Sequence, residues 1–229
     1  GSLLVLAVAV SRKHIVITYR IAHMIEHLKI SPYSILAITF TNKAAKEMRE
    51  RVNSLIGDRA KDMWISTFHS LCVRILRRDI ERIGYNKSFV IYDTQDQLSL
   101  IKECIKECGL REDSFKPSSV LSAISGAKDK LLNPKAFEAR YFNDFRLSKI
   151  SKVYDLYQRK LKSNNALDFD DLIFKTVELL KTDEFVRDFY QRKFQYVMVD
   201  EYQDTNHAQY VLINLLSEMH KNLCVVGDD

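Results

Sequence analysis

Short runs of apolar residues recur along the chain, and each is followed by apolar residues at the spacing of an amphipathic helix. This alternation is typical of βαβ units, in which helices join the parallel strands of one sheet. The six runs that we predict to be strands are Leu3–Val10, Ile35–Phe40, Trp64–Thr67, Phe89–Tyr92, Tyr196–Val199 and Leu223–Val226. The pattern therefore predicts an α/β fold with a parallel sheet.

The pattern changes in the middle of the chain. From about residue 94 to residue 165 we find helical periodicity and no convincing strand. The breaks in that periodicity lie near Gly109, Pro117, Gly126 and Pro134. The βα pattern then returns with the segment DFDDLIFKTVELL. A block of helices between strands of one sheet predicts an inserted helical subdomain, docked on the sheet domain as a separate lobe.

The segment YVMVDEYQDTNHAQ (196–209) carries the strongest chemical signal. Four apolar residues followed by Asp200 and Glu201 predict a buried strand that delivers two carboxylates to its carboxyl end, where open α/β sheets bind ligands. In a nucleotide hydrolase the first carboxylate holds Mg²⁺ and the second orients or deprotonates the attacking water. Gln203 and Asp204 lie just beyond, where they can sense the γ-phosphate. The structural alternative is a strand that ends in an acidic turn.

The string DEYQDTN, followed by Gln209, resembles the Walker B motif of the UvrD/Rep/PcrA-type superfamily 1 DNA helicases. Other segments resemble further motifs of that family in the expected order. They are AITFTNKAAKEMRERV (37–52, motif Ia), STFHSLCVRILR (66–77, motif Ib), DFDDLI (168–173, the return from the 1B insertion) and LCVVGDD (223–229, the start of motif III). The resemblance implies a RecA-like sheet of the P-loop NTPase type. It places motor subdomain 1A at residues 1–93 and 166–229, truncated in motif III, and the helical insertion 1B at residues 94–165.

The resemblance also implies roles for individual residues. Asp200 is the expected Mg²⁺ carboxylate and Glu201 the expected catalytic base, with Gln203 beside them in the catalytic group. The expected contacts to the cofactor ATP are Ser11, Arg12, Lys13, His14, Gly227 and Asp228. The residues expected along single-stranded DNA are Phe40, Thr41, Asn42, Ala44, Thr67, Phe68 and His69.

Side-chain chemistry supports the DNA assignment independently. A hydroxyl, an amide and a helix amino terminus at Thr41 and Asn42 can hold a phosphate. Phe40 or Phe68 offers a ring on which a base can stack, which suits sequence-tolerant binding of single strands. Each of these residues, taken alone, is more often a helix cap or a core aromatic.

The segment AVAVSRKH (7–14) stands where the family has a phosphate-binding loop like AGAGSGKT. Lys13 and Ser11 are kept, but Val8, Val10 and Arg12 replace glycines and His14 replaces the Mg²⁺-binding hydroxyl. A phosphate cradle needs inward-turned N–H groups and positive φ angles, which valine resists at a cost of about 1–3 kcal/mol per residue. Histidine is also a poor ligand for a hard cation. We expect the chain to bind ATP weakly or not at all.

Composition and charge add bounds to this interpretation. With 229 residues, 46% of them hydrophobic and 28% charged, the chain can bury a sizeable core. Its longest apolar stretch is far shorter than the roughly 20 residues that span a bilayer, and no signal peptide is evident, so we expect a cytoplasmic protein without a membrane partner. The four cysteines contain no CxxC pair, which favours ordinary thiols of a reducing compartment.

The formal net charge of +5 is unevenly distributed. Residues 111–165 contain twelve Lys and Arg against six Asp and Glu, so this segment accounts for the whole surplus. It is therefore a candidate surface for a polyanion, although a well-solvated helical face explains the charge equally well.

The resemblance implies the ATP-binding and DNA-binding half of an ATP-dependent 3′-to-5′ DNA helicase of repair or replication. The expected partners are single-stranded DNA, a duplex junction and the second motor domain (2A/2B) of the family, which lies outside this chain. The alternative is a non-catalytic binding module for nucleic acid or protein on the same fold. A third hypothesis rests on HMIEH (23–27), which fits the H-x-x-E-H spacing of some zinc peptidases.

Overall fold

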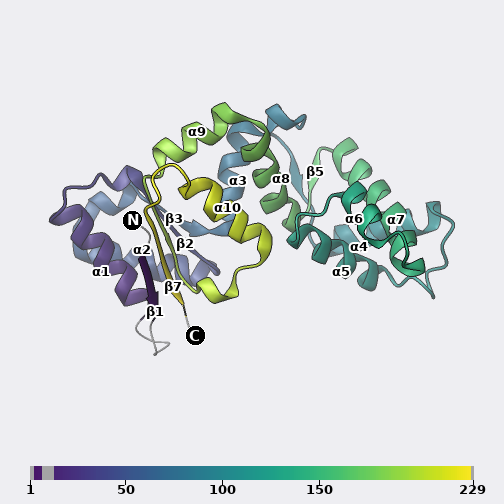
Figure 1. The fold of residues 1–229 in the computed structure, drawn as a ribbon, viewed down its shortest axis with the longest axis horizontal. Coiled ribbons are helices and arrows are strands. Elements are labelled where there is room, and N and C mark those ends of the chain that lie inside the picture. The colour runs from purple at the N-terminus through teal and green to yellow at the C-terminus, as the bar shows by residue number, and fades with distance from the viewer. Residues whose placement is uncertain (1–2, 7–12, 228–229) are drawn as a thin grey trace. The chain divides into compact units, whose positions relative to one another are not determined.

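Residues 3–6 and 13–227 are described by the structure, a computed structural model (Figure 1). Five parallel strands form its main sheet in the order β1-β7-β6-β2-β3. Their bounds are β1 (Leu3–Leu6), β2 (Ile35–Thr39), β3 (Trp64–Thr67), β6 (Tyr196–Val199) and β7 (Leu223–Gly227). The predicted α/β fold with a parallel sheet is confirmed. Residues 7–10 of the first predicted strand lie outside the described residues.

Helices cover this sheet because their apolar stripes match its faces. α1 (Lys13–Glu26) and α2 (Asn42–Ile56) share one core with alternate residues of the strands, such as Ile35 and Ala37 of β2. The buried stripe of α2 includes Met48 and Val52, as its periodicity predicts. The other helices whose residues fall wholly or partly in this unit are α3 (Phe68–Asp79), α8 (Phe169–Thr182), α9 (Glu184–Lys193) and α10 (His207–Ser217).

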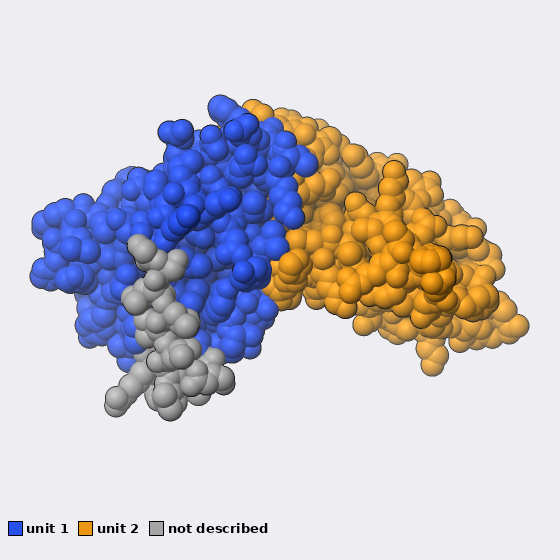
Figure 2. Space-filling model, viewed as in Figure 1, with its two compact units in different colours: residues 1–74, 179–205, 209–229 blue, residues 75–178, 206–208 orange. Residues whose placement is uncertain are grey.

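The chain divides into two compact units (Figure 2). Unit 1 comprises residues 1–74, 179–205 and 209–229, and unit 2 comprises residues 75–178 and 206–208. Four helices of unit 2 pack around a core of their own, α4 (Thr94–Glu107), α5 (Pro117–Asp129), α6 (Pro134–Tyr141) and α7 (Phe145–Ser163). Short 3₁₀ turns complete the chain at Pro32–Ser34 (η1), Gly57–Asp62 (η2), Ile80–Ile83 (η3) and Tyr202–Asp204 (η4).

Two predictions for this helical region are wrong in detail. The predicted strand Phe89–Tyr92 is not part of the main sheet, because only β4 (Val90–Ile91) is extended and it pairs with β5 (Ala166–Leu167) in a separate parallel pair. Gly126 does not break a helix but lies inside α5. A glycine costs a helix interior only about 1 kcal/mol, which the packing of α5 offsets.

A buried ionic cluster joins α5 to the start of α8. The ammonium of Lys128, whose side chain is 1% exposed, lies 2.7 Å from a carboxylate oxygen of Asp168 and 3.0 Å from one of Asp171. The Tyr157 hydroxyl donates to Asp168 at 3.0 Å, and Asp168 also accepts the backbone N–H of Asp171 at 2.7 Å. Lys128 therefore makes no contribution to the basic surface that the charge count of residues 111–165 suggests.

Candidate functional site

Most of the candidate site residues directly follow the parallel strands of the main sheet, so they lie at the carboxyl ends of those strands. β2 pairs with β6 so that Ile38 lies beside Val199, and β6 pairs with β7 so that Val199 lies beside Val225. The residues that follow these strands must therefore emerge side by side. Because β6 lies between β7 and β2, the carboxylates after β6 have the end of β7 on one side and the motif after β2 on the other.

Asp200 is held at this edge by the sheet itself. Its backbone N–H donates to the carbonyl oxygen of Ile38 at 3.0 Å, which extends the ladder between β6 and β2 by one residue. The residue is 0% exposed. A buried carboxylate is costly unless donors or a cation compensate it, so Asp200 stands where a cation is most stabilising.

Glu201 has an unusual backbone conformation. Its φ of 53° and ψ of 44° are left-handed, a region that residues other than glycine, asparagine and aspartate rarely occupy. Such conformations cost about 1–3 kcal/mol and persist where the surrounding structure imposes them. The side-chain amide of Gln203 donates to the Glu201 carboxylate. The extended backbone of the strand thus ends before Glu201, and the Gln203 amide holds the second carboxylate.

The residues after Glu201 form a short, well-bonded turn, η4. The backbone N–H of Asp204 donates to the Glu201 carbonyl at 2.9 Å. The Thr205 hydroxyl donates to the Tyr202 carbonyl at 2.8 Å, and the Thr205 N–H donates to the same oxygen at 3.2 Å. We refer to residues 200–205 as the carboxylate loop. These hydrogen bonds hold the carboxylate loop in a compact turn between β6 and α10.

Gly227, the last residue of β7, gives this loop the space it needs. A β-carbon placed on Gly227 would lie 2.6 Å from the Gln203 side-chain oxygen and 3.4 Å from the Gln203 backbone nitrogen. No side chain fits there unless Gln203 moves. The structure thus shows a packing requirement at Gly227 that the sequence motif alone did not predict.

The residues after β2 and β3 form two similar helix starts. The Thr41 hydroxyl accepts the Ala44 N–H at 3.1 Å and caps α2, as predicted, while Thr41 and Asn42 are exposed. The Thr67 hydroxyl accepts the Ser70 N–H at 3.2 Å and caps α3 in the same way, although Thr67 itself is buried. His69 follows in the first turn of α3 and is half-buried.

The two candidate stacking residues differ in exposure. Phe40 is half-buried, whereas Phe68 is only 1% exposed. Their ring centroids lie 5.2 Å apart at an interplanar angle of 61°, an edge-to-face contact. Phe68 therefore packs against Phe40, and because it is buried, a DNA base cannot stack on its ring. Phe40 is the ring of this pair that a base can reach.

The phosphate-loop side of the site is only partly described. Ser11, Arg12 and Asp228 lie outside the described residues, as does the rest of the segment 7–12. Lys13 is the first residue of α1 and His14 the second, so the helix begins where a phosphate-binding lysine is expected. The expectation that this loop weakens ATP binding stays a prediction.

The described residues fit a Mg²⁺ ion that takes only one or two ligands from the protein and the rest from water and phosphate. Among residues 3–6 and 13–227, no group of three or more His, Cys, Asp and Glu could hold a metal ion. Mg²⁺ usually takes one or two protein carboxylates and completes its shell with water and phosphate oxygens. A single buried aspartate with a neighbouring glutamate matches that requirement.

The structure gives the zinc hypothesis no support. His23 and His27 are exposed, with ring centroids 5.0 Å apart, and α1 ends at Glu26 between them in sequence. The Glu26 carboxylate accepts a hydrogen bond from Arg59 at 3.1 Å. The glutamate of the motif is thus already paired, and no third ligand joins the histidines among the described residues.

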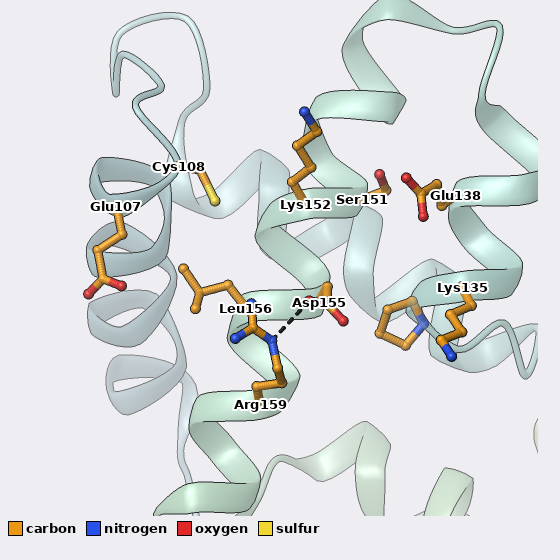
Figure 3. A pocket seen from close by; sticks show the side chains of 10 residues that line it. Glu107, Cys108, Lys135, Glu138, Ser151, Lys152, Asp155, Leu156 and Arg159 are labelled. Atoms are coloured by element: carbon orange, nitrogen blue, oxygen red, sulfur yellow. Dashed lines mark hydrogen bonds and ion pairs between the residues drawn. The ribbon is translucent and has the colours of Figure 1, made fainter.

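The four cysteines are free thiols, and three of them are buried. Burial raises the pKa of Cys104 to about 12, which keeps it protonated at neutral pH. Cys108, one turn later, borders a pocket of about 400 Å³ among α4, α6 and α7 (Figure 3). The charged residues that line this pocket are balanced in sign, Lys135, Lys152 and Arg159 against Glu107, Glu138 and Asp155. That balance favours no ionic ligand.

Comparison with known proteins finds relatives among proteins named as DNA helicases. The family model described as "UvrD/REP helicase N-terminal domain" matches residues 1–229. The chain is 54% identical over 228 residues to "ATP-dependent DNA helicase PcrA" of Bacillus subtilis (strain 168). It is 51% identical over 228 residues to the proteins of the same name from Staphylococcus aureus (strain Mu50 / ATCC 700699) and Staphylococcus epidermidis (strain ATCC 35984). Each match covers 100% of this chain and 31% of the relative, so the chain spans about a third of the relatives' length.

None of the helices in the described part of the chain has the length and apolar character needed to cross a lipid bilayer.

Proposed function

The chain belongs to the UvrD/REP helicase N-terminal domain family, and on that basis we propose that it is the nucleotide- and DNA-binding part of an ATP-dependent 3′-to-5′ DNA helicase. The observation that carries the proposal is the carboxylate loop. It holds Asp200 and Glu201 at the carboxyl edge of a parallel sheet and packs Gln203 against Gly227. We place the activity in cytoplasmic DNA repair or replication, with the second motor domain (2A/2B) as a partner.

Three residues of the loop have a task in this proposal. Asp200 holds Mg²⁺, and the buried position of its carboxylate favours a cation there. Glu201 orients and deprotonates water, and its left-handed backbone together with the Gln203 amide fixes the direction of its carboxylate. Bound ATP supplies the free energy of phosphoryl transfer. Gln203 lies between Glu201 and the end of β7, where it can report the presence of a phosphate.

Single-stranded DNA is the proposed ligand of the exposed residues after β2 and β3. The first turn of α2, with Thr41, Asn42 and Ala44, offers a helix amino terminus and an exposed amide to a phosphate. Phe40 offers a ring supported by Phe68, and a base stacked on such a ring contributes about 1–3 kcal/mol.

The helical unit supplies a second surface that suits the proposed substrate. Phe142 and Phe145 are 69% and 78% exposed at the turn between α6 and α7. The Lys149 ammonium lies 4.9 Å from the centroid of the Phe145 ring, and Arg140 and Arg146 are exposed nearby in sequence. Basic side chains with accessible rings match a nucleic acid, including a duplex junction. We assign this unit's helices to subdomain 1B (94–165) and the flanking segments to subdomain 1A (1–93 and 166–229).

We also propose that the chain binds ATP weakly because its phosphate loop contains no glycine between residues 7 and 14. The carboxylates are in place, but backbone N–H groups cannot easily turn inward at Val8 and Val10. In the second candidate function, a DNA-binding module without hydrolysis, the same fold binds DNA whether or not ATP is present. The exposed cap of α2 and the ring of Phe40 favour that function as much as the first.

A titration with fluorescent single-stranded DNA tests the DNA assignment directly. We expect binding that weakens steeply with salt, since phosphate contacts release counterions. Phe40→Ala should weaken binding by about tenfold, the loss expected for one stacked base. Tyr33→Ala, an exposed aromatic outside the motif, is the matched control and should bind as the unchanged chain does. Absence of salt-dependent binding, or equal loss in both variants, contradicts the proposal.

A further inference from the structure

A small cavity lies at the opposite edge of the main sheet from the carboxylate loop. It has a volume of about 110 Å³ and is lined by residues of α1 and of the beginnings of β6 and β7, where Tyr196 and Leu223 are the first strand residues. The carboxylate loop follows Val199, at the other end of β6. The four residues of β6, at about 3.3 Å each, separate the two places, so the cavity is distinct from the proposed nucleotide site.

Arg20 of α1 brings a cation to this cavity. The residue is half-buried, and its Nε is buried without a hydrogen-bond partner among the described residues. A guanidinium stays charged in proteins, and a buried donor of a charged group is costly when it is left unpaired. The described residues that line the cavity include no aspartate or glutamate. The cavity thus combines an unsatisfied donor with an excess of positive charge.

Cys224 does not supply the missing negative charge, although its thiol also lines the cavity. Burial raises the pKa of Cys224, and the charge of Arg20 reverses only part of that rise. The thiol therefore stays neutral at neutral pH. The partner that Arg20 lacks must come from outside the lining.

The walls of the cavity are held by strand bonds and by the core. The backbone carbonyl of Asn222 accepts the Val197 N–H at 3.0 Å, and its side-chain amide donates to the Gln195 carbonyl at 3.2 Å. Across the cavity, Met24 of α1 packs in the same core as Cys224. The cavity is therefore formed before any ligand binds, as is usual for small-molecule sites.

We propose that this cavity is a binding site for a small oxyanion, with Arg20 as its cationic ligand. The fork formed by the Nε and a terminal nitrogen of a guanidinium matches two oxygens of a phosphate or a carboxylate. The volume suits such an ion, since one water takes about 30 Å³ in the liquid and pockets for larger ligands begin at about 300 Å³. An anion bound here joins α1 to the starts of β6 and β7. The inference goes beyond the proposed function and does not depend on it.

The test is a titration of the chain followed by the NMR signal of the Arg20 Nε–H group. The probes are sodium phosphate, sodium acetate and sodium chloride at matched ionic strength. We expect a saturable shift with phosphate, acetate or both, and none with chloride, which lacks the paired oxygens. A response to phosphate alone assigns the site to free phosphate, and a response to acetate alone assigns it to carboxylates. No saturable shift with either, or an equal shift with chloride, overturns the proposal.

Variants locate the bound anion through the backbone amide signals of Leu223 and Cys224. Arg20→Gln should weaken binding by at least about tenfold, the loss expected for one charge-assisted hydrogen bond. The matched control is Arg51→Gln, which changes an exposed arginine of α2, and Lys13→Ala removes the lysine of the proposed nucleotide site. Both should bind as the unchanged chain does.

Equal loss in Arg20→Gln and Arg51→Gln, or loss in Lys13→Ala, contradicts the assignment. The shift of the Arg20 signal needs no variant, so it decides the question even if Arg20→Gln does not fold. Because the titration contains neither nucleotide nor DNA, a negative result leaves the proposed function untouched.

Discussion

Gly227 and Gln203 lie so close together that a single added carbon would force them apart. The β-carbon of an alanine at position 227 would come within 2.6 Å of the Gln203 side-chain oxygen. The amide at the other end of that group donates to Glu201. The last residue of β7 thus controls a side chain that holds the second carboxylate of the loop.

Gly227→Ala should displace the Gln203 side chain at little cost in stability. The clashing atom is the end of a flexible side chain, so we expect a loss in the free energy of unfolding of less than about 1 kcal/mol. The side-chain amide signals of Gln203 in a nitrogen–proton NMR spectrum should shift toward those of a solvated glutamine. Unshifted signals in Gly227→Ala would show that the close approach is not a feature of the folded chain.

Two glycines of the helical unit should respond to alanine in opposite directions. Neither Gly126 nor Gly109 has an atom within 4 Å of an added β-carbon. Gly126 lies inside α5, so Gly126→Ala should raise the free energy of unfolding in urea by about 0.5–1 kcal/mol. Gly109 has a φ of +67°, so Gly109→Ala should lower it by about 1–2 kcal/mol. Equal effects at both sites would refute the backbone assignment.

Lys128→Met should destabilise the chain strongly, because it leaves two buried carboxylates without their cation. We expect a loss of about 3–5 kcal/mol in the free energy of unfolding. Lys130→Met, an exposed neighbour, is the control and should change this free energy by less than about 0.5 kcal/mol. Equal losses in both variants would contradict the buried cluster.

The pH dependence of the Lys128→Met variant gives a sharper test. Burial and Asp168 raise the pKa of Asp171, and Lys128 opposes that rise. Without Lys128 the pKa of Asp171 in the folded chain should rise further. Between that pKa and the ordinary aspartate pKa, the folded chain holds a proton that the unfolded chain has released, so stability should increase as pH falls through this interval. In the original chain Lys128 limits the rise of the Asp171 pKa, so this gain should be smaller. The raised pKa of Lys128 keeps the lysine's own contribution constant over this range, since it is lost only above the ordinary lysine pKa. A parallel pH profile for the two chains would contradict the assignment.

The hydrophobic pattern predicted the sheet well because buried parallel strands leave a strong local signal. The predicted bounds of Trp64–Thr67 and Tyr196–Val199 match β3 and β6 residue for residue. The run at Phe89–Tyr92 has the same composition, but its pairing with β5 depends on a partner that follows the helical block, about 75 residues later. Local pattern cannot distinguish those two environments.

The sequence did not predict the buried ionic cluster or the backbone conformation of Glu201, for different reasons. Lys128 looks like one of several solvated lysines until the fold brings Asp168 to it across 40 residues. The left-handed turn at Glu201 has no compositional signal, because glutamate is not a turn former. Asp200 and Glu201, by contrast, were predictable as a pair, since a buried strand directly precedes them.

We propose a nucleotide site in which Asp200 and Glu201 supply the carboxylates and the phosphate loop limits ATP affinity. A calorimetric titration with Mg-ATP, on the chain as it is and on the variant V8G/V10G/R12G/H14T, tests this proposal. We predict no saturable binding at micromolar Mg-ATP for the chain. The variant should gain at least about a hundredfold in affinity, because glycine removes a cost of about 1–3 kcal/mol at each of at least two positions where a phosphate cradle requires positive φ angles. Micromolar binding by the chain itself, or no gain in the variant, would contradict the claim.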